Sequence, residues 1–498
     1  MTLRRKSGIL FHPTSLPGGH GIGDLGKWAY RFVDFLAESG QRLWQVLPLG
    51  PPGFGNSPYQ CYSSMAGNPL LVSLDLLSDE GWISKSDLER EADCGDGAVD
   101  FGCVIPFKWR FLRQAARKFF TKAPEARLEE FRWFCQDKTA WLDDFAEFAA
   151  RKDANGGAAW TEWQERADPD PAEIEVQKFV QFEFFRQWRS LRKYCHSRGI
   201  EIIGDIPIFV AHDSADVWAN PQLFDLDTGG RPRTIAGVPP DYFSATGQCW
   251  GNPLYRWDEL KRTGYRWWIE RVQSMLDLVD ITRVDHFRGF EKYYEIPGDA
   301  KTAVHGRWVE GPGDQFFAAL EKIFGRLPFI AEDLGFITPE VHSLRERWGF
   351  PGMRVLQFAF GNEDPLDAFK PYNFIPNCVV YTGTHDNDTT RGWFTAPGAG
   401  ESTRSVEQMR SERSRALSYL HSDGSEIHWD FIRAAMASVA DTAIFPMQDV
   451  LGLGSEARMN LPATAEGNWQ WRLSKDQLRP GLSARLRQMC RTYGRVPV

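Results

Sequence analysis

The stretch IEIIGDIPI at residues 200–208 is a short apolar run, rich in isoleucine and interrupted by the acid Asp205. A run of this length without polar alternation is typical of a strand that is buried on both faces of a parallel sheet. Similar runs, separated by helix-like sequence, recur at residues 8–12 (GILFH), 43–47 (LWQVL), 279–285 (VDITRVD), 329–333 (FIAED), 353–360 (MRVLQFAF), 378–384 (CVVYTGT) and 443–446 (AIFP). Eight such strands with intervening helices predict an α/β fold, a (β/α)8 TIM barrel.

The helix-like segments support this prediction. Trp28, Phe32 and Leu36 share one face of an amphipathic helix. Residues 174–194 are apolar nearly all round, as in a buried helix, and Gly199 fits its end.

Uneven strand spacing indicates how the domain is organised. We expect one catalytic barrel domain over residues 1–498, with a mainly helical subdomain at 50–199 inserted between the second and third strands, because that stretch is too long for a loop. Residues 211–256 lose periodicity and fill with Pro, Gly, Asp and aromatic residues, which indicates a loop covering the active site. Too little chain follows residue 446 for a C-terminal β-sandwich domain of about 100 residues.

Charge and cysteine content restrict the function classes. The net charge of −8, with no basic run, argues against a nucleic-acid partner. The apolar stretch at residues 8–11 is shorter than the roughly 7–15 residues of a secretory core or the about 20 of a membrane span. The eight cysteines contain no C-x-x-C pair, so we expect reduced thiols, a cytoplasmic protein and no membrane association.

The chain contains 20 tryptophans, and aromatic residues make up 14% of it. Aromatic faces can bind the apolar faces of sugar rings, although any single tryptophan is more often part of a core.

Acids occur at the ends of four predicted strands. They are Asp205, Asp285, Glu332 and Asp386, with Arg283, His286 and His385 in the same segments. Because active sites of such barrels collect at the carboxyl ends of the strands, these side chains should meet at one rim. Converging carboxylates suit glycoside chemistry, with one ionised nucleophile and one protonated acid. Arg283 lies two residues before Asp285 and should lower its pKa. From the residues alone, two of the acids could equally hold Mg²⁺.

The sequence around these acids resembles the amylomaltase family, also called 4-α-glucanotransferases or disproportionating enzymes (glycoside hydrolase family 77), which belongs with the retaining (β/α)8 enzymes of the α-amylase clan. The resemblance covers essentially the whole chain. It is carried by motifs at residues 8–18 (GILFHPTSLPG), 45–60 (QVLPLGPPGFGNSPYQ), 204–221 (GDIPIFVAHDSADVWANP), 236–255 (AGVPPDYFSATGQCWGNPLY), 283–290 (RVDHFRGF), 331–335 (AEDLG), 381–389 (YTGTHDNDT) and 455–462 (SEARMNLP). At Asp205 the motif reads Asp-Ile-Pro where wider α-amylase relatives carry Asn-His, which favours the amylomaltase branch.

The resemblance implies specific roles for the acids. Asp285 is expected to be the nucleophile, Glu332 the general acid/base and Asp386 the transition-state stabiliser. Arg283 and His385 would flank the donor sugar, and His286 would lie toward the acceptor. Further substrate contacts are expected from the third strand, the cover loop and two other loops, at Asp205, Asp241, Tyr242, Phe243, Gln248, Trp250, Tyr59 and Asn460.

At position 54 the chain has Phe where we expect Tyr in some relatives, which puts a remote glucan-binding groove there in doubt.

The implied activity is a cofactor-free, metal-free transfer of α-1,4-glucan segments from a maltooligosaccharide to glucose or another glucan, in starch or glycogen metabolism. A hydrolytic α-amylase is the alternative, since the two reactions differ in whether a sugar or water resolves the covalent intermediate. A glucan-binding scaffold with a dead barrel would lack one of Asp285, Glu332 and Asp386, and all three are present.

Two local motifs suggest other ligands and are discounted. Residues 21–26 (GIGDLG) match a dinucleotide fingerprint, but they do not directly follow a strand. Residues 225–230 (DLDTGG) resemble a calcium loop, but the twelfth position is Ala236 and not Glu.

Overall fold

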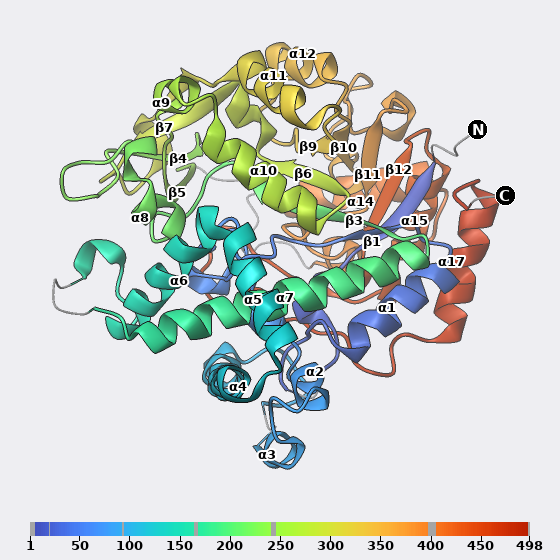
Figure 1. Ribbon diagram of the computed structural model, residues 1–498. Helices are drawn as coiled ribbons and strands as arrows, with labels where there is room; N and C mark the ends of the chain where they lie inside the picture. Colours follow the sequence, from blue (N-terminus) through green and yellow to red (C-terminus); the bar gives the residue numbers. More distant parts are fainter. Residues whose placement is uncertain are drawn as a thin grey trace.

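The computed structural model describes residues 5–18, 20–91, 94–163, 168–240, 246–396 and 405–496. Its centre is a closed barrel of eight parallel strands in the order β1-β12-β11-β10-β9-β6-β3-β2 (Figure 1). The strands are β1 (Lys6–Leu10), β2 (Leu43–Gln45), β3 (Glu201–Pro207), β6 (Ile281–Asp285), β9 (Phe329–Ala331), β10 (Gly352–Val355), β11 (Cys378–Tyr381) and β12 (Thr442–Pro446). The predicted TIM barrel is therefore confirmed, strand by strand.

Within the barrel, the differences between predicted and observed strands are confined to the strand ends. The predicted strand at 353–360 ends at Val355, because the 3-10 helix Leu356–Phe358 follows it. The barrel strands are nearly all buried, as their unbroken apolar runs require.

Helices surround the barrel (Figure 1). The amphipathic face predicted around Phe32 lies in α1 and is buried, and the apolar run at 174–194 lies in α7. The helices around the barrel are α1 (Lys27–Glu38), α7 (Pro171–Ser197), α9 (Trp257–Arg262), α10 (Arg266–Leu278), α11 (Gly313–Phe324), α12 (Pro339–Arg347), α13 (Thr390–Thr395), α14 (Val406–Leu420), α15 (Ile427–Ala437), α16 (Met447–Leu451) and α17 (Pro480–Thr492).

Between β2 and β3 the chain is mainly helical. Its helices are α2 (Leu74–Asp79), α3 (Lys85–Glu91), α4 (Phe101–Lys122), α5 (Glu125–Asp137), α6 (Thr139–Ala154) and the start of α7. Phe119 of α4 contacts Phe131 of α5 and Phe179 of α7, so an aromatic core holds this layer together.

A four-stranded antiparallel sheet, ordered β5-β4-β7-β8, lies beside the barrel. It contains β4 (Thr234–Val238), β5 (Gln248–Pro253), β7 (Lys292–Pro297) and β8 (Arg307–Glu310). The segment 211–256 is thus not irregular throughout, because it supplies α8 (Ala215–Ala219) and two strands of this sheet. These strands were not predicted because β4 pairs with β7, far along the chain.

The expectation that all cysteines are reduced is wrong. Cys94 and Cys103 form a disulfide that joins the segment before α4 to the first turn of that helix. The other cysteines are free thiols. In the part of the chain that the structure describes, no helix combines the length and apolarity needed to cross a membrane.

Candidate active site

A cleft of about 800 Å³ opens at the carboxyl ends of the barrel strands. Barrel register explains why the acids meet there: Arg283 pairs with Asp205 between β6 and β3, and Val284 pairs with Ala331 between β6 and β9. Asp285 and Glu332, each one residue further on, therefore lie on neighbouring strand ends. The predicted site residues that line the cleft are Tyr59, Gln248, Trp250, Arg283, Asp285, His286, Glu332, His385, Asp386 and Asn460.

Asp285 is paired with a buried arginine. Nη2 of Arg283 lies 2.9 Å from Oδ1 of Asp285, and Nη1 donates to both carboxylate oxygens of Asp205, at 2.8 and 2.7 Å. Burial alone would lower the pKa of Arg283, but Asp205 and Asp285 raise it above its ordinary value. The guanidinium therefore stays charged and forms an ion pair with Asp285 at the end of β6.

Asp205 lies beneath the cleft and does not line it. Its side chain is fully buried, and the Tyr59 hydroxyl donates to it at 2.9 Å. The expected contact of Asp205 with sugar stays a prediction, and in the structure Arg283 and Tyr59 lie between Asp205 and the cleft. Asp205 instead orients Arg283 and Tyr59, which do face the cleft.

Glu332 has a different environment. One carboxylate oxygen accepts from the backbone N–H of His286 at 2.8 Å, and the other accepts from Leu334 at 2.9 Å. Burial, opposed by Arg283 and reinforced by Asp285, raises the pKa of Glu332 to about 8. The carboxyl is consequently protonated at neutral pH, as a general acid must be.

The turn at His286 creates this hydrogen bond. Its φ of 50° lies in the left-handed region, which costs about 1–3 kcal/mol for a non-glycine residue. The turn directs the backbone N–H at Glu332, and the imidazole packs edge-on against Trp250 at 4.8 Å. Burial lowers the pKa of His286 to about 4, so the ring is neutral.

Asp386 lies in the loop between β11 and α13. Nδ2 of Asn460 donates to Oδ1 of Asp386 at 2.6 Å, and Nε2 of His385 lies 3.3 Å from Oδ2. Burial lowers the pKa of His385, so its ring is neutral and can donate one hydrogen bond. The Asp386 side chain is 46% exposed, compared with 27% for Asp285 and 0% for Asp205.

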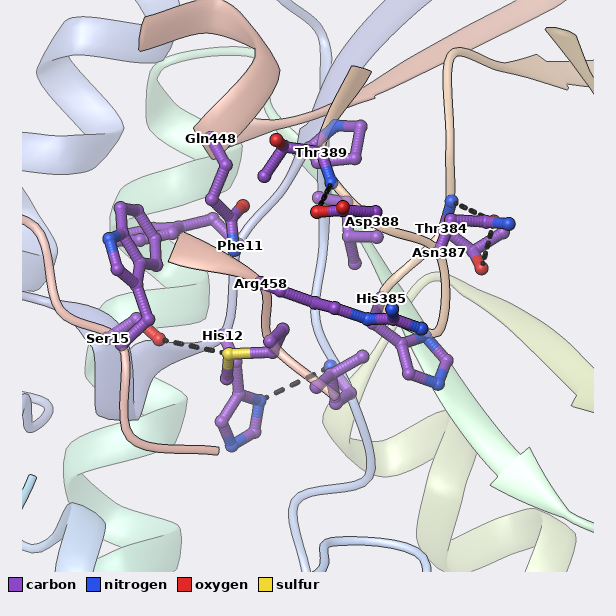
Figure 2. Close-up of a pocket in the computed structure, with 15 residues that line it drawn as sticks. Phe11, His12, Ser15, Thr384, His385, Asn387, Asp388, Thr389, Gln448 and Arg458 are labelled. Carbon is purple, nitrogen blue, oxygen red and sulfur yellow. Dashed lines mark hydrogen bonds between the residues drawn. The ribbon is translucent and has the colours of Figure 1, made fainter. Parts of the chain in front are cut away.

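A small pocket lies behind this loop (Figure 2). Within it Asn387 accepts hydrogen bonds from the backbone N–H and the hydroxyl of Thr384, both at 2.8 Å. Arg458 extends across the pocket toward His385 and donates to the carbonyl of Asp386 at 2.7 Å. These contacts fix the backbone that presents Asp386.

One end of the cleft is aromatic. Tyr59 stacks on His385 with ring centroids 4.9 Å apart, and Trp469 lies 6.0 Å from both rings. Trp469 was not predicted as a site residue. Its backbone has a left-handed φ of 65°, which is unusual for a bulky residue, but no sequence pattern around it indicates this conformation. Phe54 is 78% exposed and also lines the cleft.

Three predicted residues, Asp241, Tyr242 and Phe243, lie outside the described residues.

The discounted motifs have structural explanations. A Cβ at Gly23 would lie 2.1 Å from the carbonyl oxygen of Pro13, so this glycine of the 21–26 motif allows close chain packing. Asp227 accepts from the backbone of Gly229 and Arg231, which makes the 225–230 segment a turn. Among the residues that the structure describes, no group of three or more His, Cys, Asp or Glu is arranged to hold a metal ion.

The chain folds as a parallel (β/α)8 barrel and carries acids in contrasting environments at the ends of its strands. These two features define a barrel enzyme of the glycoside-processing type. The chain belongs to the 4-alpha-glucanotransferase family, whose model matches residues 11–478.

Several relatives match nearly the whole chain. The 4-alpha-glucanotransferase of Synechocystis sp. is 50% identical over 99% of this chain and 98% of that protein. That of Thermus thermophilus is 47% identical over 100% of both chains. Among solved structures, the amylomaltase from Streptococcus agalactiae in complex with acarbose has a TM-score of 0.92 at 40% identity, covering 99% of this chain and 100% of that one.

Proposed function

We propose that this protein is a retaining 4-α-glucanotransferase in which Asp285 is the nucleophile, Glu332 the general acid/base and Asp386 the transition-state stabiliser. The observation that carries the proposal is the contrast between neighbouring carboxyl groups. Asp285 is paired with the Arg283 guanidinium, whereas the pKa of Glu332 is raised to about 8. An ionised nucleophile beside a protonated acid is what double displacement requires.

In the first step an oxygen of Asp285 attacks the anomeric carbon of the donor glucan. The bond from that carbon to the bridging oxygen breaks, and this oxygen takes the proton of Glu332. The shortened glucan leaves with a free 4-hydroxyl, and the transferred segment remains as an ester of Asp285.

In the second step Glu332, now ionised, takes the proton of an acceptor 4-hydroxyl. That oxygen attacks the anomeric carbon, and the ester bond breaks to regenerate the Asp285 carboxylate. Two inversions retain the α configuration. Asp386, held by Asn460, supplies negative charge beside the cationic transition state in both steps.

The acceptor is a glucose or α-1,4-glucan hydroxyl and not water. Transfer requires that the ester be shielded from water while a sugar is held in line for attack. Tyr59, Trp250 and Trp469 supply aromatic walls around the acids that suit both needs. A hydrolase of the same mechanism is the second candidate.

Incubation with maltotriose tests the proposal. We expect a ladder of longer maltooligosaccharides together with glucose, resolved by chromatography. Asp285→Ala should reduce transfer by about 10⁴-fold or more, because the covalent step is lost. Asp168→Ala, at a side chain 87% exposed on the surface, is the matched control and should keep full activity. A steady rise in reducing ends without a ladder would establish hydrolysis instead, and substantial transfer by Asp285→Ala would exclude it as the nucleophile.

A further inference from the structure

One end of the cleft contains a cluster that the mechanism above does not use. It consists of Trp308 on β8, Arg288 in the 3-10 helix Phe287–Phe290 and Phe336 in the segment after β9, and we call it the Trp308 platform. Phe336 is 67% exposed, although large apolar side chains usually lose exposure on folding. An exposed aromatic ring in a cleft is a candidate ligand contact.

The platform is held in place by Arg288. Its guanidinium carbon lies 3.7 Å from the centroid of the Trp308 ring and 5.4 Å from that of Phe336. Nη1 donates to the carbonyl of Phe336 at 2.7 Å. Because Arg288 is 4% exposed, this contact fixes the segment that bears Phe336.

The rings themselves are nearly parallel. Trp308 and Phe336 have an interplanar angle of 24° and centroids 6.4 Å apart. Trp308 also packs edge-on against Tyr294, its partner across the β7–β8 pair. One ring is therefore anchored in a sheet while the other projects into solvent, an arrangement that presents flat apolar surface to a ligand.

Arg288 provides a second indication of a ligand. Its Nε is buried and has no hydrogen-bond partner among the described residues. A buried guanidinium N–H without a partner is costly, and the residue that carries it lines the cleft. Aromatic rings beside a guanidinium in a cleft wall suit a sugar, which has apolar C–H faces and hydroxyl edges.

The position of the platform relative to the acids assigns it to one side of the scissile bond. Leu334 donates to the Glu332 carboxylate, and Phe336 follows two residues later on the same segment. The residue before Arg288, Phe287, donates its backbone N–H to the carbonyl of Glu332. The platform thus belongs to the segments that hold Glu332, whereas Asp386 is held separately by Asn460 and His385.

Glu332 protonates the departing oxygen, so glucan beyond that oxygen extends past Glu332 and away from the sugar bound by Asp386. We propose that the Trp308 platform is an acceptor-side subsite, which binds a glucose unit of an α-1,4-linked acceptor beyond the unit that receives the transferred segment. This inference rests on the proposed function. A subsite at this place would make the Trp308 platform a determinant of acceptor length. A single glucose bound beside Glu332 would not reach the platform, whereas a longer acceptor would.

Acceptor-length kinetics test the proposal. With a fixed donor, transfer is measured to glucose and to maltotetraose labelled at its reducing end, which leaves the attacking 4-hydroxyl free. Phe336→Ala should raise the acceptor KM for maltotetraose by about tenfold, the order expected for losing one stacked aromatic contact, and should change that for glucose by less than about twofold. Leu366→Ala, at a side chain 84% exposed outside the cleft, is the control and should change neither value.

Conservative variants separate stacking from general apolar contact. Phe336→Tyr retains a flat ring and should behave as the parent protein, whereas Phe336→Leu should resemble Phe336→Ala. Trp308→Ala, checked for an unchanged thermal midpoint, should repeat the selective effect. Equal changes for glucose and maltotetraose, or full rescue by leucine, would overturn the subsite while leaving transferase activity intact. Absence of transfer by the parent protein would instead reject the proposed function, and the subsite with it.

Discussion

At the scale of single residues, Glu332 determines the pH range of the proposed chemistry. Its pKa of about 8 results first from burial and is reinforced by Asp285. Since the acid form is required for the first step, kcat/KM for maltotriose should be level near neutral pH and fall about tenfold per pH unit above pH 8. A profile from pH 5 to 10 checks this, and a fall that begins near pH 5 would contradict the assignment of Glu332 as the acid.

Glu332→Gln provides the control for that profile. The amide cannot transfer the proton, so activity should drop by about 10²–10⁴-fold.

The same variant tests the effect of Glu332 on stability. The pKa of Glu332 in the folded state lies above the unfolded value of about 4.3, so the stability contributed by the protonated carboxyl is lost as pH rises toward 8. The thermal midpoint of Glu332→Gln relative to the parent protein should therefore be higher at pH 9 than at pH 4.

The sequence allowed some of these residues to be predicted and not others. The positions of Asp285 and Glu332 were predictable because Asp285 ends, and Glu332 directly follows, a segment that reads as a parallel strand. The burial of Asp205 beneath Arg283 was not, because it depends on register between two strands. Trp469 and Phe336 come from segments without periodicity, and their positions follow from tertiary contacts alone.

At the scale of elements, the loop between β11 and α13 positions Asp386. Both its ends are fixed by buried Asp449, which accepts from the Thr382 hydroxyl at 2.5 Å and from the backbone of Thr390 at 2.6 Å. Between these ends, Asn387 is the acceptor that closes the turn at Thr384. The loop is therefore held by hydrogen bonds among its own residues and by hydrogen bonds to Asp449 of α16.

Asn387→Ala should loosen this loop without unfolding the barrel. Each lost hydrogen bond costs about 1 kcal/mol, and a displaced Asp386 would stabilise the transition state less well. We expect kcat for maltotriose to fall about tenfold with KM changed much less. Thr384→Ser keeps the hydroxyl and the backbone N–H, so it should remain near the parent value. An equal loss in both variants, or a loss confined to KM, would show that Asn387 does not act through Asp386.

Element prediction succeeded for the barrel and failed for the small sheet for the same physical reason. Strands buried on both faces are unbroken apolar runs, which remain visible in a single sequence. Half-exposed strands such as β5, with Gly251 at a φ of 76°, carry no such signal, and pairing of β4 with β7 compensates for weak local preference.

At the scale of the whole molecule, the cleft is assembled from parts far apart in the chain. The barrel supplies the acids, the segment at 54–60 supplies Tyr59, and β5 of the small sheet supplies Trp250. The Gln60 side chain joins the last two, because its Nε2 donates to the carbonyl of Trp250 at 3.4 Å and to Asn252 at 3.3 Å. The barrel thus provides reactive groups, and its insertions enclose them.

Because the barrel carries the acids and the inserted segments cover them, we predict that a substitution in an inserted segment can open the cleft to water while the acids stay in place. The Trp250 indole donates to Gln248 at 3.0 Å and covers His286, whose backbone holds Glu332. Trp250→Ala should admit water beside Glu332, so the ratio of hydrolysis to transfer should rise several-fold while donor consumption continues. Reducing-end release compared with ladder formation from maltotriose measures the ratio, and Trp133→Ala, at an indole 59% exposed on α5, is the matched control. If the ratio stays constant while both reactions slow together, Trp250 positions the acids and does not exclude water.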